Sequence, residues 1–434
     1  MYLSYMIYAN TLRMIFILAK RFQLTLTQEE TMLTDRQKEL VKATVPVLRE
    51  HGVALITHFY KRMLTGNPEL QNVFNNAHQA RGHQQQALAG AVLAYAENID
   101  DPTVLLNAVK HIATKHCTIG IRAEQYGIVG KHLLASIKEV LGKAATDELI
   151  DAWAAAYGQL ADILIGLEGG IYKEQTLVEG GWSGWRPFVV ECKTKETDEV
   201  TSFYLKPADK GTVSSYKPGQ FISVRVYLPE LGIMQPRQYS LSRASLQNDG
   251  LRISVKRIDA ACDKPAGLVS NHLHARVNEG DVIDVSAPTG EFYLKEGNNP
   301  VVLVSAGIGI TPILAMLQDI AAKTPRRPMK VLHVTRTTDE FALKNEVREA
   351  MAKLEKGECA VYLTRATETK EMCPCFKLGR PDASAVATLA PAADSDVYIC
   401  GPVSFMDDMR EAFVAAGVPA ANVHSEAFGT GNQS

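Results

Sequence analysis

The sequence has no hydrophobic run long enough to cross a lipid bilayer. An apolar stretch near the N-terminus, Met14–Ala19, is far shorter than the roughly 20 residues that a membrane-spanning helix needs. Lys20 and Arg21 follow this stretch, where a signal peptide would have small residues at a cleavage site. We therefore expect a chain without a signal peptide and without stable membrane insertion.

The sequence also lacks an excess of either charge and a regular cysteine pattern. Its 46 basic and 48 acidic residues give a formal net charge of -2, so it has no electrostatic footprint for nucleic acids. The seven cysteines are odd in number and scattered, which does not fit a secreted disulfide framework. Cys373 and Cys375 form the only close pair, and we interpret them as two thiols in a loop. We therefore predict a cytoplasmic protein without a nucleic-acid partner.

The first residues show no pattern of a fold of their own. Met32 directly precedes a helix-start signal, in which Thr34 is the candidate N-cap. We interpret residues 1–31 as an N-terminal extension without a predicted fold. A misassigned start codon is an alternative explanation for this segment.

Hydrophobic patterning divides the rest of the chain into three regions. Residues 32–174 are predicted to be helical, because apolar residues recur every three or four positions. Residues 181–296 show short alternating runs between turn residues, which predicts an antiparallel β-barrel. Residues 299–434 alternate apolar strands with helices, the pattern of a doubly wound α/β domain with a parallel sheet. The expected strands are Phe188–Cys192, Thr201–Leu205, Phe221–Tyr227, Leu251–Lys256, Val282–Ser286, Val301–Ser305, Val331–Val334, Ala360–Thr364 and Val397–Cys400.

One polar motif in the barrel region has chemistry suited to a flavin dinucleotide. An arginine forms bidentate hydrogen bonds to a diphosphate, a tyrosine face stacks on a flavin ring, and a serine hydroxyl bonds a ring nitrogen. Residues of these types follow the strand pair of the barrel. They are Arg237, Gln238, Tyr239 and Ser240, and Phe221 lies upstream of them. Further on, Gly267 to Ser270 form a predicted tight turn into a helix N-terminus, a site for the FAD diphosphate. An edge strand with one exposed arginine is the alternative.

A glycine-rich segment follows the first strand of the α/β region. Its glycines let the phosphates of a nicotinamide nucleotide approach the backbone, and its proline is pre-organised for a helix start. The segment consists of Gly307, Ile308, Gly309, Ile310, Thr311 and Pro312. A later strand ends at Cys400, Gly401 and Pro402, at the edge where open α/β sheets bind ligands. In this order the motifs resemble the ferredoxin–NADP reductase superfamily over residues 185–430, which implies FAD and NAD(P)H as cofactors.

The helical region contains a candidate haem ligand, His116. Haem iron accepts a neutral imidazole nitrogen on one face and leaves the other face for oxygen. The chain has 11 histidines, and a lone helical histidine is usually a satisfied surface or core residue, so the surrounding residues carry the argument. They are Tyr60, Phe74, Gln84, Leu88, Lys115, Tyr126 and Glu168. This constellation resembles the globin domain of bacterial flavohaemoglobins, and from Met32 onward the whole chain resembles a flavohaemoglobin.

The resemblance implies that His116 is the proximal ligand of the iron of haem b, with Lys115 beside it. Tyr126 and Glu168 would form hydrogen bonds near His116 and push electron density onto the iron. For Glu168, a solvated helix end is the alternative.

The resemblance also implies a distal pocket for oxygen. Tyr60 would donate its hydroxyl to bound oxygen, and Gln84 and Leu88, four residues apart on one helical face, would line the pocket. Phe74 would pack on the haem. Plain core packing is the alternative for Tyr60 and Phe74.

The activity that this family resemblance implies is that of a nitric oxide dioxygenase. Such an enzyme oxidises NO with O2 to nitrate at a globin haem that NAD(P)H reduces through FAD. FAD is needed because nicotinamides deliver electron pairs while haem takes one electron at a time. No obligate protein partner is expected. A haem-based sensor of O2 or NO is one alternative, although no output module is visible, and a general NAD(P)H-driven haem reductase of other acceptors is another.

The chain departs from the family pattern near its C-terminus, and it leaves the choice of nicotinamide open. Phe428, expected near the flavin, is retained, but the family segment usually ends in Gly-Pro. Here the segment consists of Glu426, Ala427, Phe428, Gly429 and Thr430. Arg336 follows the expected strand Val331–Val334 and could meet the 2′-phosphate of NADPH, whereas Thr337 to Asp339 could equally bond a ribose hydroxyl.

Overall fold

The computed structural model describes residues 33–74, 82–247, 249–261, 265–366, 374–389 and 392–428. The predicted extension, residues 1–31, lies outside the described residues, as do Cys373, Gly429 and Thr430. The described residues group into two compact units. One draws on the described residues within 33–63, 88–107 and 122–166, and the other on the described residues within 64–87, 108–121 and 167–428.

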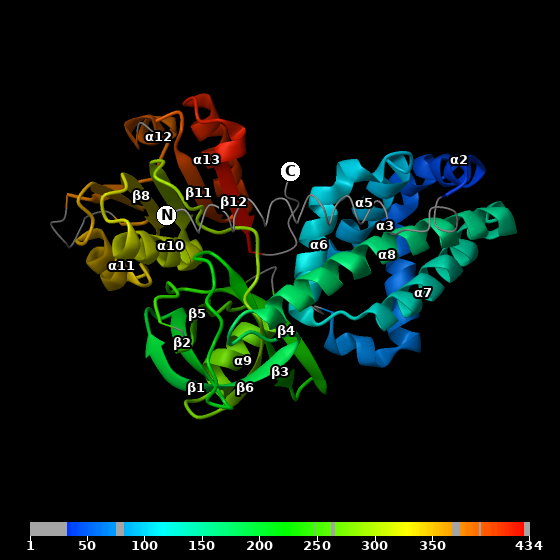
Figure 1. The fold of residues 1–434 in the computed structure, drawn as a ribbon, viewed down its shortest axis with the longest axis horizontal. Helices are drawn as coiled ribbons and strands as arrows, with labels where there is room; N and C mark the ends of the chain where they lie inside the picture. Colours follow the sequence, from blue (N-terminus) through cyan, green and yellow to red (C-terminus); the bar gives the residue numbers. More distant parts are fainter. Residues whose placement is uncertain are drawn as a thin grey trace. The chain divides into compact units, whose positions relative to one another are not determined.

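The described chain up to Leu177 is helical, as the sequence predicts (Figure 1). Its helices are α2 (Asp35–Ala43), α3 (Val45–Gly66), α5 (His83–Glu97), α6 (Leu106–Ile119), α7 (Ala123–Leu141) and α8 (Asp147–Leu177), with the 3-10 turns η1 (Pro68–Asn72), η2 (Pro102–Leu105) and η3 (Gly142–Ala144). Thr34 caps α2 as predicted, because its hydroxyl accepts a hydrogen bond from Gln37 N and the Gln37 side chain accepts one from Thr34 N. Within the described part of the chain, no helix is both long enough and apolar enough to span a membrane.

Helix α3 shows how the apolar spacing forms the core of the first unit. Leu55, Ile56, Phe59 and Met63 are at most 4% exposed, which matches the three- and four-residue repeat of an amphipathic helix. Val53 belongs to the same run in sequence but is 47% exposed. The buried face of α3 therefore does not include Val53.

The barrel region is one antiparallel sheet with the strand order β4-β3-β6-β1-β2-β5. Its elements are β1 (Trp185–Lys195), β2 (Val200–Pro207), β3 (Phe221–Leu228), β4 (Ile233–Ser240), β5 (Leu251–Lys256), α9 (Leu268–Arg276) and β6 (Val282–Ser286). Phe188, Phe203 and Val285 on three neighbouring strands are fully buried in one core. The predicted antiparallel domain is confirmed, with β4 as a strand that the sequence pattern did not predict.

The C-terminal region is a parallel sheet with the strand order β10-β9-β8-β7-β11-β12. Its elements are β7 (Val301–Ala306), η4 (Gly307–Gly309), α10 (Ile310–Lys323), β8 (Met329–Thr335), α11 (Lys344–Met351), β9 (Gly357–Leu363), β10 (Phe376–Leu378), α12 (Ala383–Leu389), β11 (Asp396–Gly401), α13 (Val403–Ala415), η5 (Ala420–Asn422) and β12 (Val423–Ala427). Helices α10 and α11 pack on one face of the sheet, and α12 and α13 pack on the other. This arrangement confirms the predicted doubly wound fold.

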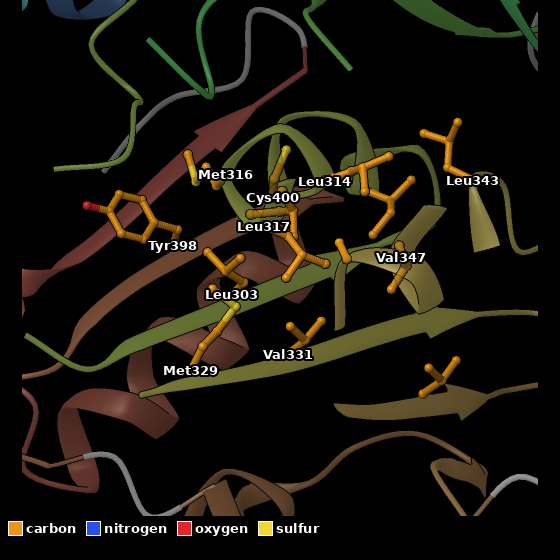
Figure 2. Close-up of a cluster of buried hydrophobic side chains, with 14 of the residues drawn as sticks. Leu303, Leu314, Met316, Leu317, Met329, Val331, Leu343, Val347, Tyr398 and Cys400 are labelled. Carbon is orange, nitrogen blue, oxygen red and sulfur yellow. The ribbon is translucent and has the colours of Figure 1, made fainter. Parts of the chain in front are cut away.

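Strand β7 contributes to both layers of this domain. Leu303 faces the cluster under α10, which Figure 2 shows in close-up, whereas Val304 faces the cluster under α13. Both side chains are fully buried, as expected for a central parallel strand. Ser305 on β7 is opposite Cys400 on β11 and His333 on β8. The segments that follow these three strands therefore meet at one edge of the sheet, where such folds bind ligands.

Candidate functional site

Two predicted residues of the helical region are in direct contact. His116 lies in the last turn of α6, and Glu168 lies on α8. The His116 Nδ1 atom is 2.8 Å from Glu168 Oε1, and Glu168 is only 2% exposed. A carboxylate partner favours the tautomer with its proton on Nδ1, which places the metal-binding lone pair on Nε2. Glu168 is therefore buried beside the imidazole and is not a solvated helix end.

The backbone on both sides of this pair is held by further contacts. The Tyr172 hydroxyl on α8 donates a hydrogen bond to Ile121 O at 2.6 Å, and Cys117 Sγ lies 3.8 Å from Glu168 O. Lys115 precedes the histidine, and burial lowers the pKa of the Lys115 ammonium. These contacts fix the separation of α6 from the end of α8, and with it the hydrogen bond between His116 and Glu168.

Three other predicted residues belong to the first unit. Tyr60 on α3 is 5% exposed, and its ring centroid lies 5.0 Å from that of Phe59. Tyr126 on α7 is 8% exposed, and its carbonyl oxygen accepts a hydrogen bond from the Tyr157 hydroxyl at 2.7 Å. Leu88 on α5 is partly buried. All three side chains are held by packing, and their roles toward a ligand stay predictions.

Gln84 and Phe74 lie in the second unit. The Gln84 Oε1 atom is buried and has no hydrogen-bond partner among the described residues. Because a buried amide oxygen without a partner is costly, Gln84 fits a site that a bound ligand completes. Phe74 follows η1, and its carbonyl oxygen accepts a hydrogen bond from Gln235 Nε2 at 3.2 Å.

The motif Arg237 to Ser240 lies on strand β4 itself. The sequence led us to predict that it would follow the strand pair, and that placement was wrong. Strand β4 pairs with β3 along its whole length, with Ser240 opposite Phe221. The pattern hid this strand because Gln235, Pro236 and Arg237 break the apolar alternation. A proline is tolerated here because β4 is an edge strand of the sheet.

Arg237 is a mostly buried cation with only neutral partners. Its Nη1 atom donates hydrogen bonds to Pro236 O at 2.6 Å and to Gln235 Oε1 at 3.4 Å, and no carboxylate of the described residues pairs with it. Burial lowers the pKa of Arg237 to about 10. Since a buried guanidinium without an anionic partner is unfavourable, Arg237 fits an anionic ligand such as a flavin diphosphate.

The other motif residues surround Arg237 on β3 and β4. Phe221 and Ser240 are each 6% exposed. Burial raises the pKa of the Tyr239 hydroxyl, so this side chain is neutral and suited to stacking. Gln238 is exposed, and its Nε2 atom donates a hydrogen bond to Thr118 Oγ1 on α6 at 3.0 Å.

The predicted helix N-terminus for a diphosphate is present at α9. Gly267 is its N-cap residue, and a Cβ atom there would lie 2.7 Å from Ser270 Oγ and 3.0 Å from Ile258 Cβ. The Ser270 hydroxyl donates a hydrogen bond to Gly267 O at 3.1 Å. The turn therefore has no room for a side chain, and it leaves the first amides of α9 to face an anion.

The two motifs predicted to bind the nicotinamide nucleotide come together at the edge of the parallel sheet. Gly307 has a φ of 55°, a left-handed conformation that glycine adopts without strain. A Cβ atom on Gly309 would lie 2.2 Å from Cys400 O, so the loop packs directly on the end of β11. Cys400 is fully buried, and burial raises the pKa of its thiol. The other residues of the two motifs lie in the same loop, at the start of α10 and before α13, namely Ile308, Ile310, Thr311, Pro312, Gly401 and Pro402.

The C-terminal strand supplies a residue that the sequence analysis did not select. Glu426 on β12 is opposite Cys400 on β11, burial raises the pKa of its carboxyl group to about 8, and the charge of Lys115 opposes that rise. Its Oε2 atom has no hydrogen-bond partner among the described residues. The sequence feature that could have pointed to Glu426 is its position next to Ala427 and Phe428, at the end of a strand. Phe428 is 47% exposed, and Gly429 and Thr430 lie outside the described residues.

Models of three protein families match successive parts of the chain. The Globin model matches residues 57–164, the Oxidoreductase FAD-binding domain matches residues 187–293, and the Oxidoreductase NAD-binding domain matches residues 303–411. Their order agrees with the predicted order of an all-α, a β-barrel and an α/β region.

Relatives and solved structures match over nearly the whole chain. A Flavohemoprotein from Bordetella pertussis is 53% identical over 402 residues, which cover 92% of this chain and 99% of the relative. A Flavohemoprotein from Chromobacterium violaceum is 51% identical over 401 residues, with coverages of 92% and 99%. The crystal structure of a flavohemoglobin from Malassezia yamatoensis with bound FAD and heme has a TM-score of 0.80 at 29% identity, and the match covers 92% of this chain and 100% of that chain.

A further solved structure matches the reductase part alone. It is the flavohem-like FAD/NAD binding domain of nitric oxide dioxygenase from Vibrio cholerae, with 37% identity, a TM-score of 0.51, and coverage of 56% of this chain and 98% of that chain. Together with the half-identical relatives that span more than nine tenths of this sequence, these matches show that the chain belongs to the flavohaemoprotein family, an oxidoreductase in which a globin is fused to FAD- and NAD-binding domains.

Proposed function

We propose that this flavohaemoprotein is a nitric oxide dioxygenase, which oxidises NO with O2 to nitrate at the expense of NAD(P)H. When bound, haem b supplies an iron centre for the two gases, and FAD converts the hydride of NAD(P)H into single electrons. The observation that carries the proposal is the 2.8 Å contact between His116 Nδ1 and Glu168 Oε1. A carboxylate on this nitrogen makes the imidazole a stronger electron donor, which favours activation of oxygen over reversible storage.

On the proximal side, we assign His116 as the iron ligand, with its Nε2 atom as the donor. Glu168 holds the Nδ1 proton and the ring orientation, and its burial keeps water from competing for that hydrogen bond. Family membership supports a second hydrogen-bonding role for Tyr126 and a flanking role for Lys115.

On the distal side, we assign Tyr60 as the residue whose hydroxyl donates a hydrogen bond to oxygen. A hydroxyl in a dry pocket stabilises developing negative charge more strongly than it would in water. Gln84 has a buried Oε1 atom without a partner among the described residues, and the Nε2 group of the same amide is the donor that would serve bound oxygen. Family membership supports a role for Leu88 and for Phe74 in excluding water from the haem.

In the reductase part, backbone and side chains share the binding of the two dinucleotides. Arg237 and the first-turn amides of α9, from Leu268 to Ser270 after the Gly267 turn, would bind the FAD diphosphate. The flavin ring would contact residues of β3 and β4 and the C-terminal segment, namely Phe221, Gln238, Tyr239, Ser240, Ala427 and Phe428. The nicotinamide nucleotide would bind over Gly307–Pro312 and Cys400–Pro402, where a Cβ atom on Gly309 would lie 2.2 Å from Cys400 O.

The proposed substrates are the small molecules NO and O2. No separate reductase protein is required, because the globin, FAD-binding and NAD-binding matches lie in one chain. We place the protein in the cytoplasm, where NAD(P)H is supplied.

The test compares NADH oxidation by the protein loaded with haem and FAD, under air, with and without NO. We expect NO to raise the rate of NADH oxidation strongly. A sensor would bind NO with little NADH turnover. A general haem reductase would oxidise NADH with peroxides or flavin-mediated acceptors and would gain nothing from NO.

A further inference from the structure

Arg336 lies where dinucleotide-binding folds distinguish NADH from NADPH. It directly follows β8, and the register of β8 with β7 places it at the same sheet edge as the Gly307–Gly309 loop. At the corresponding position in such folds, an acidic residue bonds the 2′-hydroxyl of the adenosine ribose in NADH, whereas an arginine accommodates the 2′-phosphate of NADPH. By residue type alone, Arg336 would favour NADPH.

The guanidinium of Arg336 is already engaged by two carboxylates. Its Nη2 atom lies 2.7 Å from Glu199 Oε2, and its Nε atom lies 2.8 Å from Glu340 Oε2. All three side chains are only about one third exposed, at 33%, 32% and 35%. The hydrogen bond lowers the pKa of Glu199 and raises that of Arg336. Both shifts indicate that the pair is charged.

Glu199 approaches Arg336 from the barrel, on a backbone that is itself fixed. It occupies the turn before β2, where the Thr197 hydroxyl accepts hydrogen bonds from Glu199 N at 3.2 Å and Val200 N at 3.1 Å. The Glu199 carbonyl oxygen accepts a hydrogen bond from Arg257 N at 2.7 Å. The carboxylate is therefore held at Arg336 by the fold of the turn.

We propose that Glu199 is a specificity-determining residue, which occupies the side of Arg336 that a 2′-phosphate would need and thereby selects NADH over NADPH. The inference rests on the nicotinamide site assigned above. A 2′-phosphate carries a charge of about -1.5 to -2 and would have to displace Glu199, leaving a carboxylate beside it. A ribose hydroxyl is neutral, and it can donate to Glu199 or Glu340 without breaking either ion pair.

Lys256 completes the charge balance of this cluster. Its Nζ atom lies 3.1 Å from the same Glu199 Oε2 atom. Two cations and two carboxylates therefore cancel, and the cluster has no net attraction for a phosphate. Removing the charge of Glu199 leaves one net positive charge near the position of the 2′-oxygen, because Glu340 still offsets one of the two cations.

The experiment uses the full chain with FAD bound and ferricyanide as electron acceptor, so that neither haem nor NO is involved. The quantity measured is the ratio of kcat/KM for NADPH to that for NADH. The wild type should prefer NADH. Glu199→Gln should raise the ratio by up to about fivefold, the effect of one partly exposed ion pair, mainly through a lower KM for NADPH. The inhibition constant of 2′,5′-ADP should fall relative to that of 5′-AMP.

Two further variants decide whether Arg336 receives the phosphate. Glu191→Gln removes a different exposed ion pair of the barrel, with Lys206, and should leave the ratio unchanged. Adding Arg336→Ala to Glu199→Gln should abolish the gain. A wild type that prefers NADPH, an unchanged ratio in Glu199→Gln, or a gain that persists in the double variant would each overturn the proposal. Wild-type protein that oxidises neither nucleotide would overturn the reductase assignment itself.

Discussion

The site around His116 and the site around Gly309 are built in opposite ways. The first depends on two side chains 52 residues apart in sequence, joined by one hydrogen bond of 2.8 Å. The second depends on the absence of side chains, since a single added carbon on Gly309 would lie 2.2 Å from Cys400 O. Removing atoms should therefore destroy the first site, and adding atoms should destroy the second.

The largest expected effect is that of His116→Ala. The variant removes the proposed protein ligand of the haem iron, so it should lose haem or oxygen binding while it keeps FAD, because the barrel is untouched. The measurement is the Soret and flavin absorbance of the purified protein. His111→Ala, on the same helix α6, is the matched control and should retain haem. A normal Soret band with normal oxygen binding in His116→Ala would remove His116 from the site.

Gly309→Ala tests the other half of the comparison. Overpacking costs about 1–3 kcal/mol, so the rate of flavin reduction by NADH should fall by about tenfold or more, with haem content unchanged. Stopped-flow measurement of flavin bleaching gives the rate. Gly127→Ala, where a Cβ would meet nothing within 4 Å, is the control. Normal flavin reduction in Gly309→Ala would show that the loop is not the nicotinamide site.

Tyr60→Phe asks whether the helical site also needs its distal hydroxyl. The lost hydrogen bond to a charged group is worth about 1.5–3 kcal/mol, so oxygen should dissociate about 10- to 150-fold faster. Haem and flavin contents should stay normal. Tyr95→Phe removes a buried hydroxyl that donates to Ala156 O and Gln159 Oε1, and it should lower stability without changing oxygen release. Equal oxygen off-rates in wild type and Tyr60→Phe would reduce Tyr60 to a packing residue.

The smallest effect near neutral pH concerns His333, which lies beneath the nicotinamide loop. Burial lowers its pKa to about 3, its Nδ1 atom lies 2.9 Å from Ser305 Oγ, and its ring stacks on Phe341. Because the folded pKa lies below that of a free histidine, its contribution to stability is present above about pH 6.5 and is lost as pH falls toward about 3. Acid should therefore weaken the α/β domain.

The measurement for His333 is calorimetric unfolding of wild type and His333→Gln. Between about pH 7 and pH 5, the wild type should lose about 1–2 kcal/mol more than the variant. Parallel pH profiles would mean that His333 does not titrate on unfolding.

The comparison also explains what could be predicted from sequence. The Gly307–Gly309 turn after β7 was predictable because a mostly apolar run, Val301–Ser305, is followed by glycines, which is a local pattern. Strands β4 and β12 could not be predicted in this way, since polar residues such as Arg237 and Glu426 interrupt their apolar pattern. The contact of His116 with Glu168 had no local signal and came only from the family resemblance. The pairing of Arg336 with Glu199, 137 residues away, was beyond any sequence pattern, which is why the choice of nicotinamide stayed open.

The most direct test of the central claim is the product balance of the loaded protein under air. Each conversion of NO and O2 to nitrate takes up one electron, so one NADH should support the consumption of two molecules of NO. We predict nitrate formation in that ratio, dependent on O2 and abolished in His116→Ala. NADH oxidation that proceeds at the same rate without NO, or NO loss without nitrate, would contradict the account.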